Sequence, residues 1–131
     1  MWVTDLVTGD EVELFDKPSD YLWAGYNWSP DGKWLVLMAR PEPNKGSQML
    51  LVSPEGADKG MQVLLEIDQG GAVSFSPDGK RIVFESKSVL YLMNLDDRKP
   101  RKIPGQMGKN KDPHWSYDGK WIVFSSNRDL P

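Results

Sequence analysis

One short pattern, an aromatic residue followed by Ser-X-Asp-Gly, occurs three times in this chain of 131 residues. The copies are WSPDG at 28–32, FSPDG at 75–79 and WSYDG at 115–119. Their aspartates, Asp31, Asp78 and Asp118, are 47 and then 40 residues apart. Repeats at a period near 40 residues are typical of β-propellers, in which each repeat is one four-stranded sheet, or blade. The repeat therefore constrains the fold more than any other feature of the sequence.

Each copy is followed by short runs of β-branched, aromatic and aliphatic residues, which favour strands over helices. No segment has a 3.6-residue periodicity over a helix length, and glycine and proline interrupt the chain often. We therefore predict an all-β fold whose blades are four antiparallel strands joined by hairpins. The predicted strands after the turns lie at 33–40, 80–87 and 120–127, and further strands lie within 48–56, 61–67, 89–97 and 100–105.

The repeated motif has the chemistry of a tight hairpin turn. Proline fixes φ at the second turn position, aspartate suits the third, and glycine accepts a positive φ. Tyr117 replaces the proline in the third copy, and we expect the same geometry there. The aromatic residue before each turn is expected to pack between neighbouring sheets. The residues assigned to this structural repeat are Trp28, Ser29, Pro30, Asp31, Gly32, Phe75, Ser76, Pro77, Asp78, Gly79, Trp115, Ser116, Asp118 and Gly119.

The repeats divide the chain into four parts of one propeller-repeat domain. We predict an outer half-blade at 1–17, blades at 18–68 and 69–108, and an inner half-blade at 109–131. The two half-blades are complementary, because one supplies the last two strands of a blade and the other supplies the first two. The chain thus carries three blades' worth of strands.

The turn motif with its following lysine, the Ile/Leu-Val-Phe/Leu strand after it and SSNRD at 125–129 resemble the WD-like propeller repeat of the TolB-like family. The resemblance covers essentially the whole chain. It implies a six-bladed propeller, or a propeller domain attached to a prolyl-oligopeptidase-type hydrolase, and many such propellers act as protein-binding scaffolds. The chain departs from the family in having three copies of the repeat.

Three blades cannot close into a ring, so an open arc would leave strand edges and apolar faces in water. We therefore expect a homodimer in which each chain completes the blade begun by the other, so that two-fold symmetry gives six blades. The alternative is that the sequence is an excerpt of a longer TolB-like or prolyl-oligopeptidase-type protein.

Charge and composition narrow the classes of partner. The net charge is −3, and the densest basic cluster, at 96–102, also contains acids and a proline, which favours a solvated turn over a nucleic-acid site. No stretch is long and apolar enough for a membrane span, and the first residues do not form a signal peptide. As written, the sequence indicates a cytoplasmic protein, or a periplasmic or secreted one if it was cut from a precursor.

The sequence favours a protein that is not an enzyme. It has no G-x-S-x-G nucleophile motif, a single histidine, no cysteine and no H-E-x-x-H or calcium-loop motif. We therefore predict no catalytic residue, no cofactor and no metal site, and we interpret the turn aspartates as turn caps. Four glutamates were considered as paired carboxylates, and each was interpreted as solvated surface: Glu42, Glu55, Glu66 and Glu85.

Binding is the remaining function. The loops that enter each innermost strand and those that join the second strand to the third share one rim, at 17–27, 39–48, 68–73 and 105–114. We predict protein–protein interaction there, through Tyr21, Trp23 and Tyr26, which are residue types enriched at interfaces; Trp23 could equally pack between blades, and Tyr26 is expected to begin the inner strand. His114 is a further candidate, pointing into the channel. The alternatives are a carbohydrate-binding, small-molecule-binding or enzymatic propeller with a channel site.

Overall fold

The computed structural model describes residues 1–15, 22–40 and 45–129, and these residues form twelve strands and one 3₁₀ turn. The first sheets contain β1 (Trp2–Thr4), β2 (Glu11–Glu13), β3 (Leu22–Trp28), β4 (Leu35–Arg40), β5 (Ser47–Val52) and β6 (Met61–Ile67). The later ones contain β7 (Gly70–Phe75), β8 (Arg81–Ser86), β9 (Val89–Asn94), β10 (Pro100–Lys102), β11 (Asn110–Trp115) and β12 (Ile122–Ser126). The 3₁₀ turn η1 (Ala57–Lys59) lies between β5 and β6, where the sequence predicted only a polar turn.

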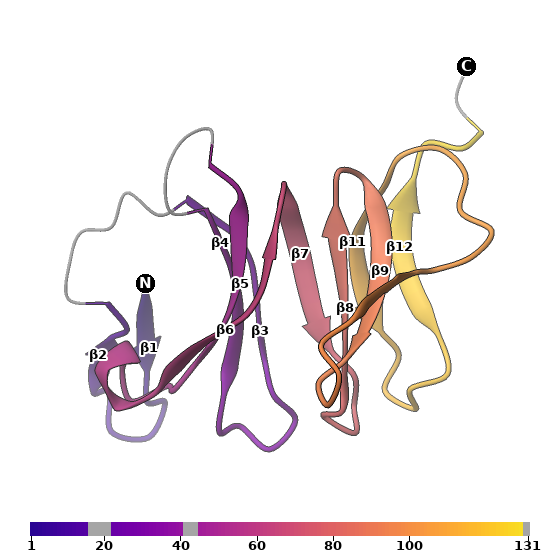
Figure 1. Cartoon of the computed structure of the whole chain (residues 1–131). Helices are drawn as coiled ribbons and strands as arrows, with labels where there is room; N and C mark the ends of the chain where they lie inside the picture. Colours follow the sequence, from indigo (N-terminus) through magenta and orange to yellow (C-terminus); the bar gives the residue numbers. More distant parts are fainter. Residues whose placement is uncertain (16–21, 41–44, 130–131) are drawn as a thin grey trace.

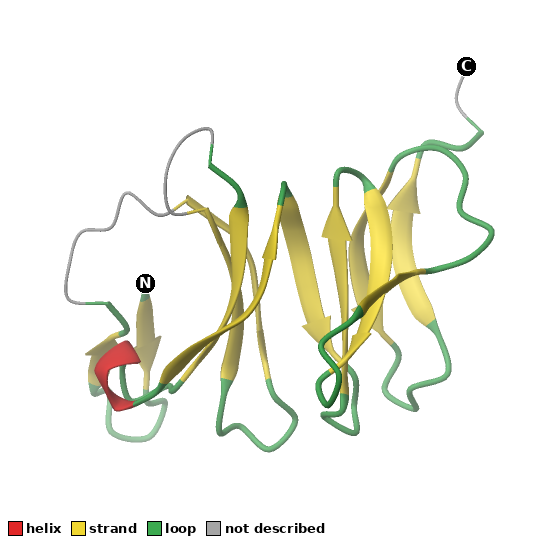
Figure 2. Ribbon diagram, viewed as in Figure 1, coloured by secondary structure: helices red, strands yellow, loops and turns green. Residues whose placement is uncertain are grey.

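The strands form two four-stranded antiparallel sheets, β3-β4-β5-β6 and β7-β8-β9-β10, and two hairpins, β1-β2 and β11-β12. Figures 1 and 2 show these four units side by side in chain order, with the hairpins at the two ends. The innermost strands β3, β7 and β11 are neighbours from one unit to the next. The chain is therefore all-β, and its sheets are antiparallel blades of the kind the sequence predicts.

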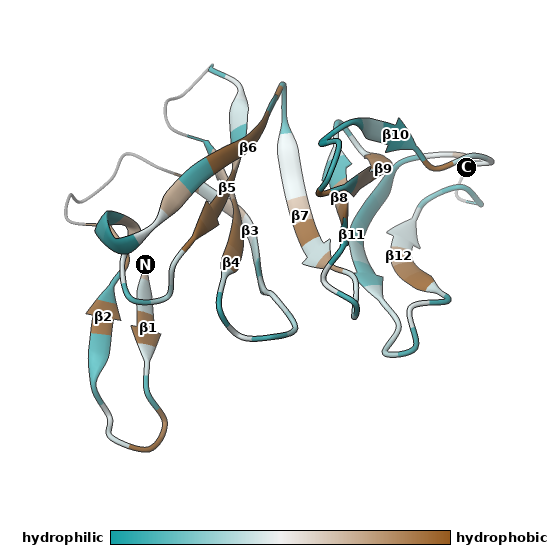
Figure 3. Cartoon of the chain, turned by 60° about the horizontal axis from the view of Figure 1, so that its bottom comes forward, coloured by the Kyte–Doolittle hydropathy of each residue, from teal (hydrophilic) through white to brown (hydrophobic). Residues whose placement is uncertain are grey.

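Two hydrophobic cores hold neighbouring units together. One core lies between the four-stranded sheets and includes Met38, Met49, Phe75 and Phe84. The other packs the β1-β2 hairpin on the first sheet and includes Leu14, which is buried. Because β4 and β5 contribute to both cores, their apolar residues are consecutive, and Figure 3 shows both strands as strongly hydrophobic.

The three repeated turns have one geometry. Gly32, Gly79 and Gly119 have φ values of 70°, 71° and 72°, as expected for a turn that ends in the left-handed region. The third turn keeps this geometry with Tyr117 in place of proline, as predicted. All three turns lie at the same end of the molecule, which we call the turn end.

The aromatic residues before the turns differ in burial. Phe75 is 7% exposed and packs between the two four-stranded sheets, as predicted. Trp28 is 45% exposed, which contradicts the expectation that all three pack between sheets. The cause of this exposure is the neighbour of β3 on that side. Only the outer hairpin β1-β2 lies there, and no inner strand of the described chain covers Trp28.

Three features of the sequence interpretation lie outside the described residues. Tyr21 and the proposed boundary between residues 17 and 18 fall in 16–21, and Glu42 falls in 41–44. Within the described part of the chain, no helix is long and apolar enough to cross a membrane.

Candidate binding rim

A shallow polar hollow of about 200 Å³ lies at the end of the molecule opposite the repeated turns. It brings together the end of β4, the start of β5, the β6–β7 turn and the β8–β9 turn. The end of β4, the start of β5 and the β6–β7 turn fall in the rim loops predicted at 39–48 and 68–73, whereas the β8–β9 turn lies outside the predicted ranges. Its lining residues are Arg40, Lys45, Gly46, Asp68, Gln69 and Lys87.

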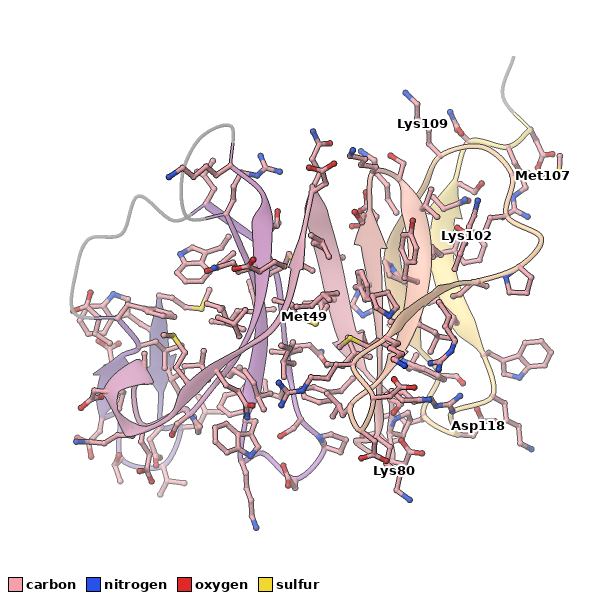
Figure 4. All side chains as sticks on the ribbon, viewed as in Figure 1. Met49, Lys80, Lys102, Met107, Lys109 and Asp118 are labelled. Atoms are coloured by element: carbon pink, nitrogen blue, oxygen red, sulfur yellow. The ribbon has the colours of Figure 1, made fainter. Side chains whose placement is uncertain are left out.

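More charged residues lie at the same end of the neighbouring strands. Glu85 ends β8 near Lys111 and Asp112 of β11, whose charges act on its carboxyl group. Figure 4 shows Lys109 at this end of the molecule and Lys80 and Asp118 at the turn end. We call the following set the charged rim: Arg40, Lys45, Asp68, Gln69, Glu85, Lys87, Lys109, Lys111 and Asp112.

The charged rim is more positive than the rest of the molecule. It contains five basic residues and three acidic ones, and with Glu66 near the end of β6 the count is five to four, whereas the whole chain has a net charge of −3. Lys87 pairs its ammonium group with the Asp68 carboxylate, and both side chains are exposed. An exposed pair of this kind contributes little to stability, so the pairing of Lys87 with Asp68 leaves room for a binding role of these two residues.

The backbone of the charged rim is irregular in every innermost strand. The pairing register shifts between Trp23 and Gly25 in β3, between Gly70 and Val73 in β7, and between Lys111 and His114 in β11. Such bulges bend a strand and redirect side chains, and they are common beside functional sites. The repeat thus places one bulge per inner strand near the rim.

The rim also holds strained residues. Of the four non-glycine residues with positive φ in the described chain, Lys87 (φ 50°), Ser88 (φ 63°) and Asp112 (φ 53°) lie in or next to the charged rim. The β8–β9 turn is fixed on three sides, because the Lys87 N–H donates to the Gln69 carbonyl, the Asn110 N–H donates to the Ser88 carbonyl, and the Ser88 N–H donates to Glu85 Oε1. Conformations of this type cost stability and cluster at functional sites.

Glu85 is half-buried, whereas the other two acids of the charged rim, Asp68 and Asp112, are exposed. Burial raises the pKa of its carboxyl group, and the nearby Asp112 charge acts in the same direction. The Ser88 N–H and the Lys111 charge oppose this rise in pKa. Glu85 is half-buried, so its interpretation as solvated surface is wrong, because the β8–β9 turn and β11 cover it.

Trp23 and Tyr26 do not meet at the rim. Trp23 is half-buried and stacks on Phe15 with ring centroids 5.0 Å apart, next to the core beneath the β1-β2 hairpin. Tyr26 is exposed, but it lies in the middle of β3 and lines a groove with Trp2 and Trp28. The expectation that Tyr26 begins the strand is wrong, because β3 starts at Leu22.

His114 lies away from the charged rim. It is exposed and lines a hollow of about 370 Å³ that also contains Pro30, Pro77 and Tyr117 of the repeated turns. Tyr21 is outside the described residues. The structure therefore brings none of the three described candidates, Trp23, Tyr26 and His114, into the charged rim, and the sequence did not predict the nine rim residues as a set.

Within the described residues, no group of three or more histidine, cysteine, aspartate or glutamate side chains could hold a metal ion. The turn aspartates are engaged in local hydrogen bonds. Asp31, Asp78 and Asp118 each accept from the serine hydroxyl two residues earlier, at 2.6 to 2.7 Å, and from the backbone N–H two residues later, at 3.0 Å. These bonds agree with their interpretation as turn caps.

No protein-family model matches the chain. Among curated proteins, it is 26% identical over 160 residues to "Uncharacterized protein Atu1656" of Agrobacterium fabrum, covering 88% of this chain and 52% of that protein. It is 26% identical over 127 residues to "Uncharacterized peptidase YuxL" of Bacillus subtilis, covering 97% of this chain and 18% of that protein. The chain thus spans about half of the first relative and less than a fifth of the second.

Solved structures share the fold at lower identity. TolB from Acinetobacter baumannii superposes with a TM-score of 0.79 at 22% identity, over 98% of this chain and 32% of that one. An oligogalacturonate lyase in complex with manganese superposes with a TM-score of 0.77 at 16% identity, over 98% of this chain and 38% of that one. The fold is therefore that of β-propeller blades, shared with TolB and the oligogalacturonate lyase.

Proposed function

We propose that this chain is a non-catalytic binding module that recognises an acidic segment of another protein at the charged rim. The observation that supports this most directly is the coincidence of a basic surplus with strained backbone at Lys87, Ser88 and Asp112. Lys87 and Ser88 form the two-residue turn between β8 and β9, where a type I′ hairpin needs positive φ at both positions. Glycine or asparagine would adopt this conformation at lower cost, so lysine and serine there, beside exposed charges, favour a role in recognition.

The shape of the rim supports a protein partner. Its hollow of about 200 Å³ is smaller than the roughly 300–1,000 Å³ of typical small-molecule pockets. The basic side chains come from separate loops, so an extended acidic segment lying across the rim could contact several of them. Complementary charge of this kind guides association and fixes the orientation of a partner.

The test is a titration of the isotope-labelled chain with a synthetic glutamate-rich peptide, followed by NMR. We expect the shifts to concentrate at 68–69, 85–88 and 109–112 and to weaken with added salt. Lys87→Ala and Lys111→Ala should each weaken binding about two- to five-fold, because an exposed charge pair contributes about 0.2–1 kcal/mol.

Lysines at the turn end provide matched controls. Lys80→Ala and Lys120→Ala remove the same charge next to the second and third repeated turns, at the opposite end of the molecule, and should leave the peptide affinity unchanged. Equal weakening by rim and turn-end variants would show a non-specific charge effect. A lysine-rich peptide that binds as well as the glutamate-rich one would also contradict the proposal.

A second candidate function is recognition of an acidic oligosaccharide at the same rim. It is favoured by Glu85, a half-buried acid with raised pKa between Lys111 and Asp112, and by the shared fold of the oligogalacturonate lyase. The same titration with oligogalacturonate and with a neutral oligosaccharide separates the two. Shifts caused by oligogalacturonate and not by the peptide would favour the saccharide.

A further inference from the structure

Successive units of the chain contact one another through the repeated turns in a regular way. A Cβ atom at Gly79 would lie 3.6 Å from Cδ of Pro30, and one at Gly119 would lie 3.7 Å from Cδ of Pro77. Each turn thus packs its second residue against the glycine of the next turn. This contact occurs twice in the described chain.

At each end of the described chain, one of the two residues of this contact is present and the other is absent. Tyr117 has the position of the two prolines in the third turn, and it is fully exposed. Gly32 has the position of the receiving glycine in the first turn, and nothing lies within 4 Å of a Cβ built there. One end therefore presents a donor residue and the other end an empty acceptor.

A second repeated contact shows the same arrangement. It involves the second residue after each turn glycine. The guanidinium of Arg81 lies 4.6 Å from the ring of Trp115, the aromatic residue before the next turn, and Trp34, the corresponding residue of the first repeat, packs on the core that contains Phe75. The third such residue is Trp121, which is 73% exposed. The unmatched aromatic residue is Trp28 at the other end of the molecule.

The open ends are also apolar grooves. A groove of about 600 Å³ between the β1-β2 hairpin and β3 is lined by Trp2, Leu14, Tyr26 and Trp28, where two inner strands would complete a blade. A groove of about 420 Å³ beside β11 and β12 is lined by Leu92, Trp121 and Phe124, among others, where two outer strands would complete a blade. The first groove lacks a pair of inner strands such as β11 and β12, and the second lacks a pair of outer strands such as β1 and β2.

We propose that a second copy of this chain fills both grooves through a two-fold axis, so that β12 of each copy pairs antiparallel with β1 of the other. The two interfaces between the copies are then identical. The assembly contains six four-stranded sheets, in which the free edges of β12 and β1 are paired with each other. Trp121 of one copy packs on Trp28 of the other, and Tyr117 packs on Gly32. The inference does not depend on the binding role of the charged rim.

The register of the new strand pair follows from the complete blade. In β8 and β9, Val83 lies opposite Leu92. Val83 lies four residues after Gly79, and Val123 lies four residues after Gly119. Because the turns share one geometry, Val123 in β12 corresponds to Val83.

The β1 strand aligns with β9 in the same way. The hairpin that leaves β9 has six residues between the paired Met93 and Pro100, and the hairpin that leaves β1 has six between the paired Thr4 and Glu11. Val3 therefore corresponds to Leu92. The assembly places Val123 of one copy directly opposite Val3 of the other.

Cysteine cross-linking tests this register, because the chain has no native cysteine. The double variant V3C/V123C should form, on mild oxidation, a disulfide-linked species of twice the chain mass that returns to the single-chain mass on reduction. The matched control T4C/V123C moves one cysteine to the next residue, whose side chain points to the opposite face of the strand. It should cross-link at least ten-fold less.

Three results would overturn the proposal. They are equal cross-linking of both variants, a ladder of species larger than two chains, and an internal disulfide in a single-chain species. Because cysteine variants can fail to fold, a second test uses Trp121→Glu, which changes an exposed residue. It should raise the dimer dissociation constant at least ten-fold, while Met61→Glu on the outer strand β6 should not; a dimer unaffected by Trp121→Glu would contradict the proposed contact.

Discussion

The repeated turns show how much one residue can do in this chain. In the second turn, the Ser76 hydroxyl donates to Asp78 Oδ1 at 2.6 Å and accepts from the Arg81 N–H at 2.9 Å. The sequence predicts the roles of aspartate and glycine, because their turn preferences are strong. It does not predict the role of serine, whose hydroxyl joins the aspartate to the following strand.

The turn aspartates link stability to pH. The pKa of Asp78 lies below its ordinary value because the Ser76 hydroxyl and then the Lys80 N–H donate to its carboxylate. A group whose pKa is lower in the folded state stabilises the fold above its unfolded pKa of about 3.9. That stabilisation is lost as the pH falls through the folded pKa.

We therefore expect Asp78→Asn to lower the free energy of unfolding at pH 7, and this deficit to shrink as the pH falls below about 4. Urea unfolding at one fixed protein concentration, at pH 7 and pH 3, measures both effects. Asp96→Asn, at an exposed residue outside the repeated turns, is the control and should leave the free energy of unfolding unchanged at both pH values. A deficit of equal size at both pH values would contradict the explanation by ionised aspartate.

At the scale of elements, close packing of the inner strands depends on Gly25. A Cβ atom there would lie 2.9 Å from both the Ala72 Cα and the Gly71 carbonyl oxygen of β7. Both neighbours are backbone atoms, so they cannot move aside as a flexible side chain would. The approach of β3 to β7 therefore requires glycine at this position.

Gly25→Ala should lower the free energy of unfolding by about 1–3 kcal/mol, the usual cost of overpacking. Chemical denaturation measures this loss. Ala24→Ser also adds one heavy atom, at the exposed neighbouring residue, and should change stability by less than about 0.5 kcal/mol. Similar losses for the two variants would show that the backbone contact with β7 is not limiting.

The strands could be predicted from the sequence more completely than the candidate site. The predicted run 61–67 coincides with β6, because apolar runs between turn residues are a strong signal. The bulge between Trp23 and Gly25 gives no such signal, and it sets which face each neighbouring side chain occupies. Tyr26 therefore lies on the face toward the β1-β2 hairpin instead of at the rim, and Trp23 lies on the same face, in agreement with the alternative that it packs between blades.

The charged rim could not be predicted for a related reason. Its basic residues are single positions near the ends of separate strands, so they form no run that composition or spacing would show. The left-handed conformation of Lys87 and Ser88 is also unexpected, because glycine or asparagine is the usual choice in a two-residue hairpin. A possible signal was the recurrence of a lysine or arginine near the rim end of each repeat.

For the whole molecule, the central feature is the complementarity of its two ends. Each contact between successive units has its missing half at the opposite end of the chain: Tyr117 with Gly32, and Trp121 with Trp28. Each of these pairs would repeat, between two chains, a contact that already occurs within one chain. The proposed assembly of two chains would satisfy them, and it would also cover the apolar grooves.

The most direct test of this account is the solution mass of the purified chain of 131 residues, measured by sedimentation at micromolar concentration. We predict a single species of about twice the 14.9 kDa chain mass. A folded species of one chain mass, with the far-ultraviolet signature of a β-sheet protein, would contradict it.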